Sequence, residues 1–317
     1  TLVVSLVAAI AYLAFLRPAQ GLDARTHGPG RTLVARPAAD AFGRSGNLRM
    51  RFALPDQPVD YPIEVQGGLS KLRYAWVVLG EEIATEQARS LIAGLTAPSR
   101  PGFYRLEVSL GDERQLVDGL PLAVLVPLSE KKGSTLNGYR MGFYRGERAR
   151  RSDPEPPTGF VEIDTTHLDL AVSAHLRLAD FVTHDNQSTW PRYAAVDPRV
   201  LDKVELVLGE IENWSGDPAR NRVPFDVQSG YRTPLHNRLV RSAARDSRHQ
   251  QGDALDLAVD ANRDGRVNSK DTKLVALAVE IVERAHPDLA GGMGIYTRKG
   301  PSYVHIDARG TRVRWRG

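Results

Sequence analysis

The stretch Ser247-Arg-His-Gln-Gln-Gly-Asp-Ala-Leu-Asp256 decides the fold of this chain, together with Tyr303-Val-His-Ile-Asp307 near its C-terminus. Residues 252–260 alternate, which predicts a strand. Its large apolar side chains would face the core, and Asp256 would lie on the opposite face between the small residues Ala254 and Ala258. The second stretch alternates in the same way and places His305 on the corresponding face. We therefore expect two strands that present polar side chains on one side of a sheet.

Three side chains of these stretches form a candidate zinc site: His249, Asp256 and His305. Three protein ligands with a water in the fourth position are typical of a catalytic zinc, whereas structural sites close all four positions. The chain has no cysteine, so a thiolate site, disulfides and cysteine catalysis are excluded. Side chains two residues apart on a strand are separated by about 6.6 Å. Asp307 is therefore expected to reach a metal-bound water as a general base, or the ring of His305 as an orienting carboxylate.

The Ser-x-His-x-x-Gly-x-Ala-x-Asp pattern resembles a motif of the zinc D-alanyl-D-alanine metallopeptidases of the bacterial cell wall, which share the hedgehog-type fold. The resemblance implies that His249 and Asp256 are two of the zinc ligands. The family's later Glu-x-x-His-x-His motif carries the general base and the third ligand, and His305 matches that ligand. Here Ser302 occupies the position of the glutamate, and Asp307 that of the last histidine. A His-x-Asp ending is closest to the murein endopeptidase branch.

Upstream, Ser229-Gly-Tyr-Arg-Thr-Pro-Leu-His-Asn237 extends the resemblance, which covers about residues 137–317. In the family this arginine faces the substrate, so the resemblance implies that Arg232 anchors a substrate carboxylate, to which a guanidinium forks two parallel bonds. The implied activity is zinc-dependent hydrolysis of peptidoglycan peptide bonds, by a carboxypeptidase or an endopeptidase. Because of Ser302, a catalytically inactive peptidoglycan-binding protein or envelope scaffold is the alternative.

A second motif directly follows the first predicted strand. Residues 260–271 fit the twelve-residue calcium loop, with oxygen ligands at positions 1, 3, 5 and 9, a backbone carbonyl at 7, glycine at 6 and a carboxylate at 12. The final carboxylate belongs to aspartate where glutamate is usual. The hypothesis is a structural Ca²⁺ site, and the alternative is a polar turn without metal. The candidate ligands are Asp260, Asn262, Asp264, Arg266, Asn268 and Asp271.

The N-terminal residues 1–17 are expected to act as a membrane anchor or signal segment. Residues 2–16 are apolar apart from Ser5, but this run is shorter than the roughly 20 residues that span a bilayer. Because no small-x-small cleavage site follows, we favour an uncleaved anchor that starts before this sequence over a cleaved signal peptide. Either segment would export the remaining chain to the periplasm or cell exterior of a bacterial envelope. Residues 18–46 are rich in Gly, Pro, Ala and Arg, which is typical of a linker.

Residues 47–128 carry short strand patterns separated by Gly, Pro and Asp turns, which predict a small β-sandwich domain. These patterns occur at residues 48–54, 63–66, 74–79, 103–110 and 120–126. The domain has no histidine and no catalytic constellation, so we expect a spacer or a docking module for an envelope protein. The connector, residues 129–165, contains a predicted strand at 136–144 and an arginine cluster. That cluster is either a solvated face or a contact for anionic lipid or wall polymer.

Residues 166–317 predict an α+β zinc-peptidase domain, with helices on one face of a small antiparallel sheet. Asp197-Pro198 is a helix start, with aspartate as N-cap and proline at the first helical position. Further helices are expected at 234–245 and 273–286, a strand at 225–229, a tight turn at the glycines of 291–294 and an edge strand at 309–316. The net charge of +4 is mild and does not call for a nucleic-acid partner.

Overall fold

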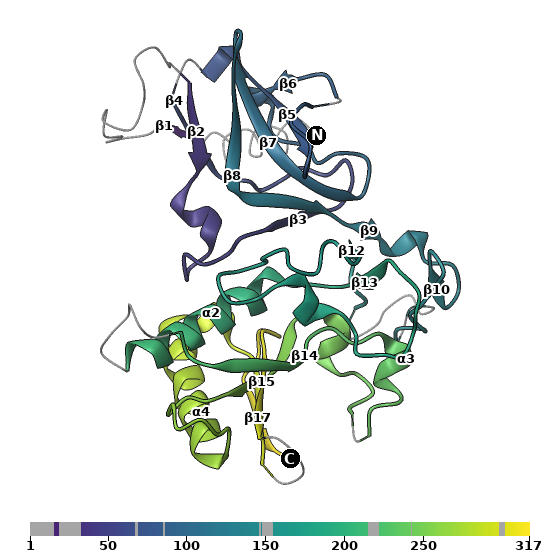
Figure 1. The fold of residues 1–317 in the computed structure, drawn as a ribbon, viewed down its shortest axis with the longest axis vertical. Coiled ribbons are helices and arrows are strands. Elements are labelled where there is room, and N and C mark those ends of the chain that lie inside the picture. The colour runs from purple at the N-terminus through teal and green to yellow at the C-terminus, as the bar shows by residue number, and fades with distance from the viewer. Residues whose placement is uncertain are drawn as a thin grey trace. The chain divides into compact units, whose positions relative to one another are not determined.

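The computed structural model describes residues 16–18, 33–66, 69–84, 86–145, 147, 155–214, 222–241, 243–297 and 302–317. The chain divides into two compact units, Thr1–Val126 and Pro127–Gly317 (Figure 1). Helices and several sheets together confirm the predicted mixed α+β class. Most of the predicted membrane segment, residues 1–17, lies outside the described residues. Within the described ranges, no helix combines the length and the apolar composition that crossing a bilayer requires.

The first unit consists of two sheets and short 3-10 helices around a shared hydrophobic core. The core takes side chains from both sheets, such as Ile63 and Val65 from one and Leu106, Val108 and Leu122 from the other. The five-stranded sheet has the order β3 (Arg51–Ala53), β8 (Glu113–Val124), β7 (Gly102–Leu110), β5 (Leu72–Val78) and β6 (Arg89–Ser90). The three-stranded sheet has the order β1 (Leu16–Pro18), β4 (Ile63–Gln66) and β2 (Val34–Pro37). The 3-10 helices are Ala39–Phe42, Leu69–Lys71 and Leu91–Ala93.

The end of the predicted linker belongs to this first unit. Strand β2 pairs with β4, and the side chains of Leu33, Ala35 and Ala41 are buried in the core. The linker prediction for residues 18–46 is therefore wrong over its last part. A short apolar run between Gly- and Pro-rich stretches has little periodicity of its own, and only pairing with β4 makes it a strand.

The second unit is built on a five-stranded sheet that carries the two predicted key strands at its centre. Its order is β14 (Phe225–Ser229), β15 (Ala254–Val259), β17 (Tyr303–Asp307), β16 (Gly292–Tyr296) and β18 (Val313–Arg316). Neighbouring strands are antiparallel except β16 and β18, which are parallel. Residues 292–294, predicted as part of a turn, thus lie inside a strand. Smaller sheets join β13 (Arg192–Ala194), β12 (Gly159–Ile163) and β9 (Val126–Pro127), and β10 (Thr135–Leu136) and β11 (Tyr139–Arg140).

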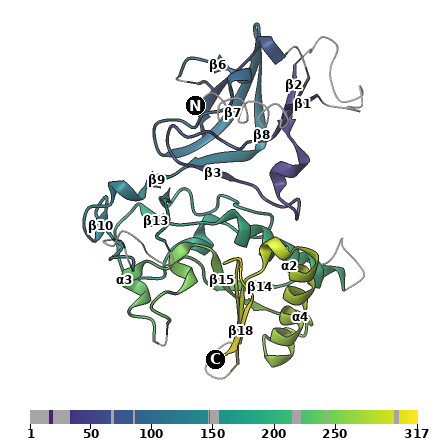
Figure 2. The same ribbon diagram turned by 180° about the vertical axis from the view of Figure 1, so that it is seen from behind.

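Two long helices lie side by side and contact the central sheet, as Figures 1 and 2 show from opposite sides. They are α2 (Pro198–Asn213) and α4 (Ser269–Ala285). The side chain of Asp197 accepts a hydrogen bond from the backbone N–H of Arg199, which confirms the predicted N-cap. Lys203 of α2 is fully buried and donates from Nζ to Glu283 and to the Asp307 carbonyl, both at 2.7 Å. This contact ties both helices to β17.

Two further predicted elements in the second unit are wrong. The strand expected at 136–144 is instead the tight hairpin of β10 and β11, because Asn137 and Gly138 adopt φ values of 45° and 87°. An Asn-Gly pair strongly favours such a two-residue turn. The helix expected at 234–245 is only the single turn α3 (Pro234–Asn237). There the Asn237 side chain donates to the Ala244 carbonyl at 2.9 Å, which turns the chain back. Within the described residues of this unit, further 3-10 helices are Leu128–Glu130, Leu178–Phe181, Arg248–Gln251 and Pro287–Leu289.

Candidate metal centre

The pairing of β15 with β17 places Asp256 directly opposite His305. His249 lies on the 3-10 turn that precedes β15, and Gly252 ends this turn in a left-handed conformation with φ of 74°. A Cβ at Gly252 would clash with the carbonyl of Ala195. Glycine therefore allows the chain to leave the turn and enter β15 at once. The predicted strands and turn bring all three candidate ligands to one place.

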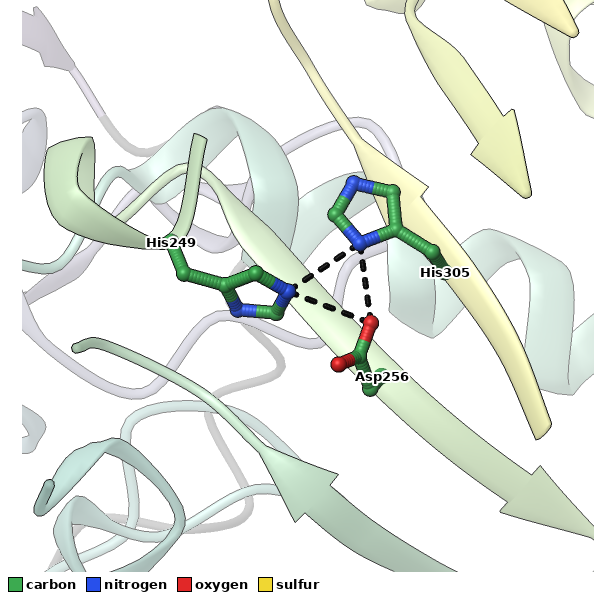
Figure 3. A group of neighbouring side chains, drawn as sticks. All are labelled: His249, Asp256 and His305. Carbon is green, nitrogen blue, oxygen red and sulfur yellow. Dashed lines mark hydrogen bonds and ion pairs between the residues drawn. The ribbon is translucent and has the colours of Figure 1, made fainter. Parts of the chain in front are cut away.

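The three side chains converge at close range (Figure 3). Nε2 of His249 lies 3.1 Å from Oδ1 of Asp256 and 3.1 Å from Nδ1 of His305. The latter nitrogen lies 2.8 Å from the same Asp256 oxygen. All three residues are buried. Of the residues that the structure describes, only these form a group of three or more His, Asp or Glu side chains whose ligand atoms lie close together.

The outward-facing atoms of both rings decide which nitrogens are available to a metal. Nδ1 of His249 donates to the Gly230 carbonyl at 2.7 Å, and a carbonyl can only accept. Nε2 of His305 faces the carboxylate of Asp307 at 3.2 Å, which in its ionised form also only accepts. In the neutral form of each ring the inner nitrogen is therefore unprotonated, and the two lone pairs then face each other and the Asp256 carboxylate. A cation removes this repulsion, so the donor set fits a zinc ion.

Burial and neighbouring charge shift the pKa values of the three residues in different directions. Burial alone would lower the pKa of His305, but its hydrogen bonds to Asp256 and Asp307 raise it, so without a cation this ring is protonated more readily than that of His249. Burial lowers the pKa of His249, which favours the neutral ring that binds metals. Burial alone would raise the pKa of Asp256, but the facing His249 and His305 outweigh it and hold that pKa well below its usual range. The carboxylate is therefore ionised at neutral pH.

Asp307 lies behind His305 rather than in the open site. Its side chain is 0 % exposed. Nε of Arg309 donates to both of its oxygens at 2.9 and 3.0 Å, and the backbone N–H of Gly292 donates to Oδ1 at 2.7 Å. These contacts, together with His305, hold the pKa of Asp307 well below its usual range against the effect of burial. The geometry suits a residue that orients His305, the second of the two roles expected for Asp307.

Arg232 lies beside the cluster and contacts it directly. Its Nη2 donates to Oδ2 of Asp256 at 2.6 Å, and its Nε donates to the Ser229 hydroxyl at 2.7 Å. The two oxygens of Asp256 thus have separate partners, since Oδ1 faces the histidines. The guanidinium also lines the cleft over the site. Arg232 therefore contacts the carboxylate of a candidate ligand and also lines the cleft, and its predicted role in anchoring a substrate carboxylate stays a prediction.

A cleft of about 460 Å³ opens over the cluster, and its aromatic wall was not expected from the sequence. The rings of Tyr296 and Tyr303 stack at 4.6 Å, and Nε1 of Trp315 donates to the Tyr296 hydroxyl at 2.8 Å. Burial raises the pKa of Tyr303 to about 12, so its hydroxyl stays protonated at neutral pH. The Trp315 ring lies 5.1 Å from that of His305.

Trp315 reaches His305 across the intervening strand because of a glycine. Gly294 of β16 is paired with His305 on one side and with Trp315 on the other. A Cβ at this position would clash with the indole ring. The sequence predicted that Trp315 lies on an edge strand. Only the sheet order shows that this strand pairs with β16.

The predicted calcium loop connects β15 to α4. Its two terminal carboxylates accept hydrogen bonds from the loop itself: Asp260 from the N–H groups of Asp264 and Gly265, and Asp271 from those of Asn262 and Asn268 at 3.1 and 2.9 Å. Asn268 and Asp271 together form a capping box at the start of α4. Hydrogen bonds within the loop and the cap of α4 therefore explain these polar residues without a metal. Calcium binding by the loop stays a prediction.

Comparison with known proteins identifies the region that contains the cluster. Residues 174–315 match the family model described as peptidoglycan L,D-endopeptidase MepK. The crystal structure of Serratia marcescens L-Ala D-Glu endopeptidase ChiX matches over 36% of this chain and 80% of its own, with 21% sequence identity and a TM-score of 0.26. No curated protein matches the chain. The family match confirms, over residues 174–315, the resemblance to murein endopeptidases inferred from the sequence.

Proposed function

We propose that the C-terminal region, which matches the family of peptidoglycan L,D-endopeptidases, hydrolyses peptide bonds of bacterial peptidoglycan with the help of a zinc ion. The observation that supports this most strongly is the convergence of His249, Asp256 and His305 with both outer ring nitrogens already engaged. Such pre-oriented imidazoles are typical of metal sites, because the outer hydrogen bond selects the tautomer that leaves the inner nitrogen free.

The residues around the ligands have separate roles in this proposal. Bound by His249, Asp256 and His305, zinc would supply Lewis-acid polarisation of the scissile carbonyl and acidification of a water. Arg232 holds Oδ2 of Asp256, so that Oδ1 stays directed at the histidines. The protonated hydroxyl of Tyr303 offers a hydrogen-bond donor on the cleft wall. Hydrogen-bond donors aimed at a developing oxyanion stabilise the transition state.

Asp307 acts on the reaction through His305 in this proposal. It is completely buried, and its oxygens accept from His305, Arg309 and the Gly292 N–H, so it does not contact substrate. Among the described residues that line the cleft, the carboxylates are Asp246 and Asp256. The family's glutamate position holds Ser302, which is buried. This departure is the observation that favours the second candidate function, a catalytically inactive peptidoglycan-binding protein.

The family description favours an endopeptidase over a carboxypeptidase. A peptidoglycan substrate also implies a place in the bacterial cell envelope, with residues 1–17 as the proposed membrane anchor. Recruitment of an envelope protein by the first unit remains a proposal as well.

Hydrolysis of purified muropeptides, followed by mass spectrometry with and without a chelator, tests the function. The zinc-loaded protein should cleave an internal peptide bond, and chelation should abolish cleavage. His249→Ala should lose both bound zinc and turnover, whereas His184→Ala, an exposed histidine outside the cleft, should retain both. Binding of muropeptides without cleavage by the zinc-loaded protein would instead establish the inactive binding function.

A further inference from the structure

A second hollow of about 440 Å³ lies beside the catalytic cleft and shares Val240 and Ala243 with its lining. We call it the arginine groove. Its characteristic lining residues are Phe143, Arg145, Asn237, Arg238, Arg245 and Gln250. None of them belongs to the metal cluster or to its supporting contacts. The shared wall places this groove next to the cleft.

The arginine groove is strongly cationic. Three arginines line it, and no Asp or Glu does so among the described residues. The side chains of Arg238 and Arg245 are exposed and have no acidic partner in the described part of the chain. Arg145 makes one exposed ion pair, with Asp246 at 3.4 Å. A concave surface of a single charge sign attracts ligands of the opposite sign.

Buried amides and an aromatic ring complete the groove. Asn237 is only 4 % exposed and donates to the Ala244 carbonyl, but its Oδ1 has no hydrogen-bond partner among the described residues. Gln250 is 5 % exposed, and its Nε2 donates to the Arg245 carbonyl at 3.0 Å. The ring of Phe143 is 38 % exposed. A peptide combines carboxylates, which pair with guanidinium groups, with apolar groups that pack on an aromatic ring.

We propose that the arginine groove binds an anionic, carboxylate-bearing segment of the peptide whose scissile bond lies in the cleft. This inference rests on the proposed function, since it extends the substrate beyond the catalytic site. Arg238 and Arg245 receive the carboxylates, to which guanidinium groups bind through paired hydrogen bonds. The groove thus selects substrates by their free carboxyl groups and contributes to binding rather than to the chemical step.

The test compares Arg238→Gln/Arg245→Gln with the wild type on two peptidoglycan peptides that differ only in whether their carboxyl groups are free or amidated. The double variant should raise KM for the free acid by roughly tenfold and leave kcat within about twofold, because uniform binding is lost. It should not change KM for the amidated peptide. Arg284→Gln, which removes an exposed charge from α4 on the same unit, is the matched control and should change neither.

Equal KM values for wild type and double variant on the free acid would overturn the proposal, as would an equal effect on both peptides. Added salt should weaken binding of the free acid to the wild type more than to the double variant. Direct titration of the same peptides into both proteins measures Kd without requiring cleavage. It therefore tests binding by the arginine groove separately from the proposed hydrolase activity. If the wild type cleaves nothing, the proposed hydrolase fails, and the difference in Kd between the free and amidated peptides still decides the arginine groove.

Discussion

Asp307 illustrates how a residue outside the ligand set controls one inside it. Its Oδ2 accepts from Nε2 of His305, and Arg309 and the Gly292 N–H hold the carboxylate in place. The other ligands have corresponding partners, since Gly230 holds His249 and Arg232 holds Asp256. Each ligand therefore has one atom directed at the metal position and another fixed by the protein.

Replacing Asp307 with asparagine should weaken zinc binding without unfolding the site. An amide is a poorer acceptor than a carboxylate, so the ring of His305 is less basic and less firmly oriented. Loss of such a partner typically costs 10- to 100-fold in metal affinity or activity. Competition with a chelator of known affinity measures the change in the Kd for zinc.

Arg309→Gln is the matched control. It removes the ion pair between Arg309 and Asp307, but the Asp307 carboxylate can still accept a hydrogen bond from His305. Its effect on the Kd for zinc should be clearly smaller. If both variants bind zinc as tightly as the wild type, Asp307 does not position His305.

His175 should make the stability of the second unit depend on pH. A hydrogen bond to Glu205 raises its pKa above 6.5 in spite of burial, and the charges of Glu205 and Glu212 act in the same direction. The protonated ring is thus favoured by folding. Its stabilisation is complete below the unfolded pKa of about 6.5 and is lost as pH rises through the higher folded pKa.

Thermal melts of wild type and His175→Gln across this pH range measure the effect. The difference in Tm between the two proteins should shrink as pH rises above the folded pKa of His175. A constant difference at all pH values would show that the ring contributes by packing alone.

Among the elements, the turn Arg248–Gln251 depends on a single glycine. Gly252 closes the turn with φ of 74°, and the carbonyl of Ala195 leaves no room for a side chain. The turn carries His249, while β15 directly after it carries Asp256. The distance between these two ligands is therefore set by the backbone conformation at residue 252.

Gly252→Ala should destabilise the second unit by about 3 kcal/mol, since a left-handed alanine and a steric clash each cost about 1–3 kcal/mol. The variant should also bind less zinc, because His249 moves with the turn. Gly209→Ala, within α2 and with open space around it, should instead stabilise by about 0.5–1 kcal/mol and keep its zinc. Urea denaturation and metal analysis of both variants check these values. Equal stability of the two variants would contradict this account of the turn.

Across the whole molecule, the metal position joins segments that are distant in the chain. It takes ligands from the turn at 248–251, from β15 and from β17, whereas the helices α2 and α4 contact the sheet and are tied to β17 by Lys203. Unfolding of this unit separates the ligands. We therefore expect zinc binding at this cluster to be linked to folding, so that the ion stabilises the folded unit.

Zinc at 1,000 times its Kd should stabilise the folded protein by about 4 kcal/mol. Calorimetry should show a higher unfolding temperature for the zinc-loaded wild type than for the protein with chelator. The same comparison on His249→Ala should give no difference. A shift of equal size in that variant would mean that zinc binds elsewhere.

Local patterns were sufficient for many features. Alternation over 252–260 and 303–307 predicted β15 and β17, and Asp197-Pro198 predicted the start of α2. The ligand candidates His249, Asp256 and His305 also followed from residue type and spacing, and the structure brings them together. The two strands and the helix start depend on interactions between neighbours in the chain, so their positions can be predicted from the sequence alone.

Tertiary structure alone decided the remaining features. The single turn of α3 depends on the Asn237 contact with Ala244, and the Trp315 contact with His305 depends on Gly294 in a strand between them. Which imidazole nitrogen faces the metal position depends on Gly230 and Asp307. The contacts of Gly230 with His249 and of Trp315 with His305 join separate elements, and the free energy of such packing exceeds local preferences. The contacts of Asn237 and Asp307 are closer in the chain, but they depend on backbone turns and strand pairing that no periodic pattern reveals.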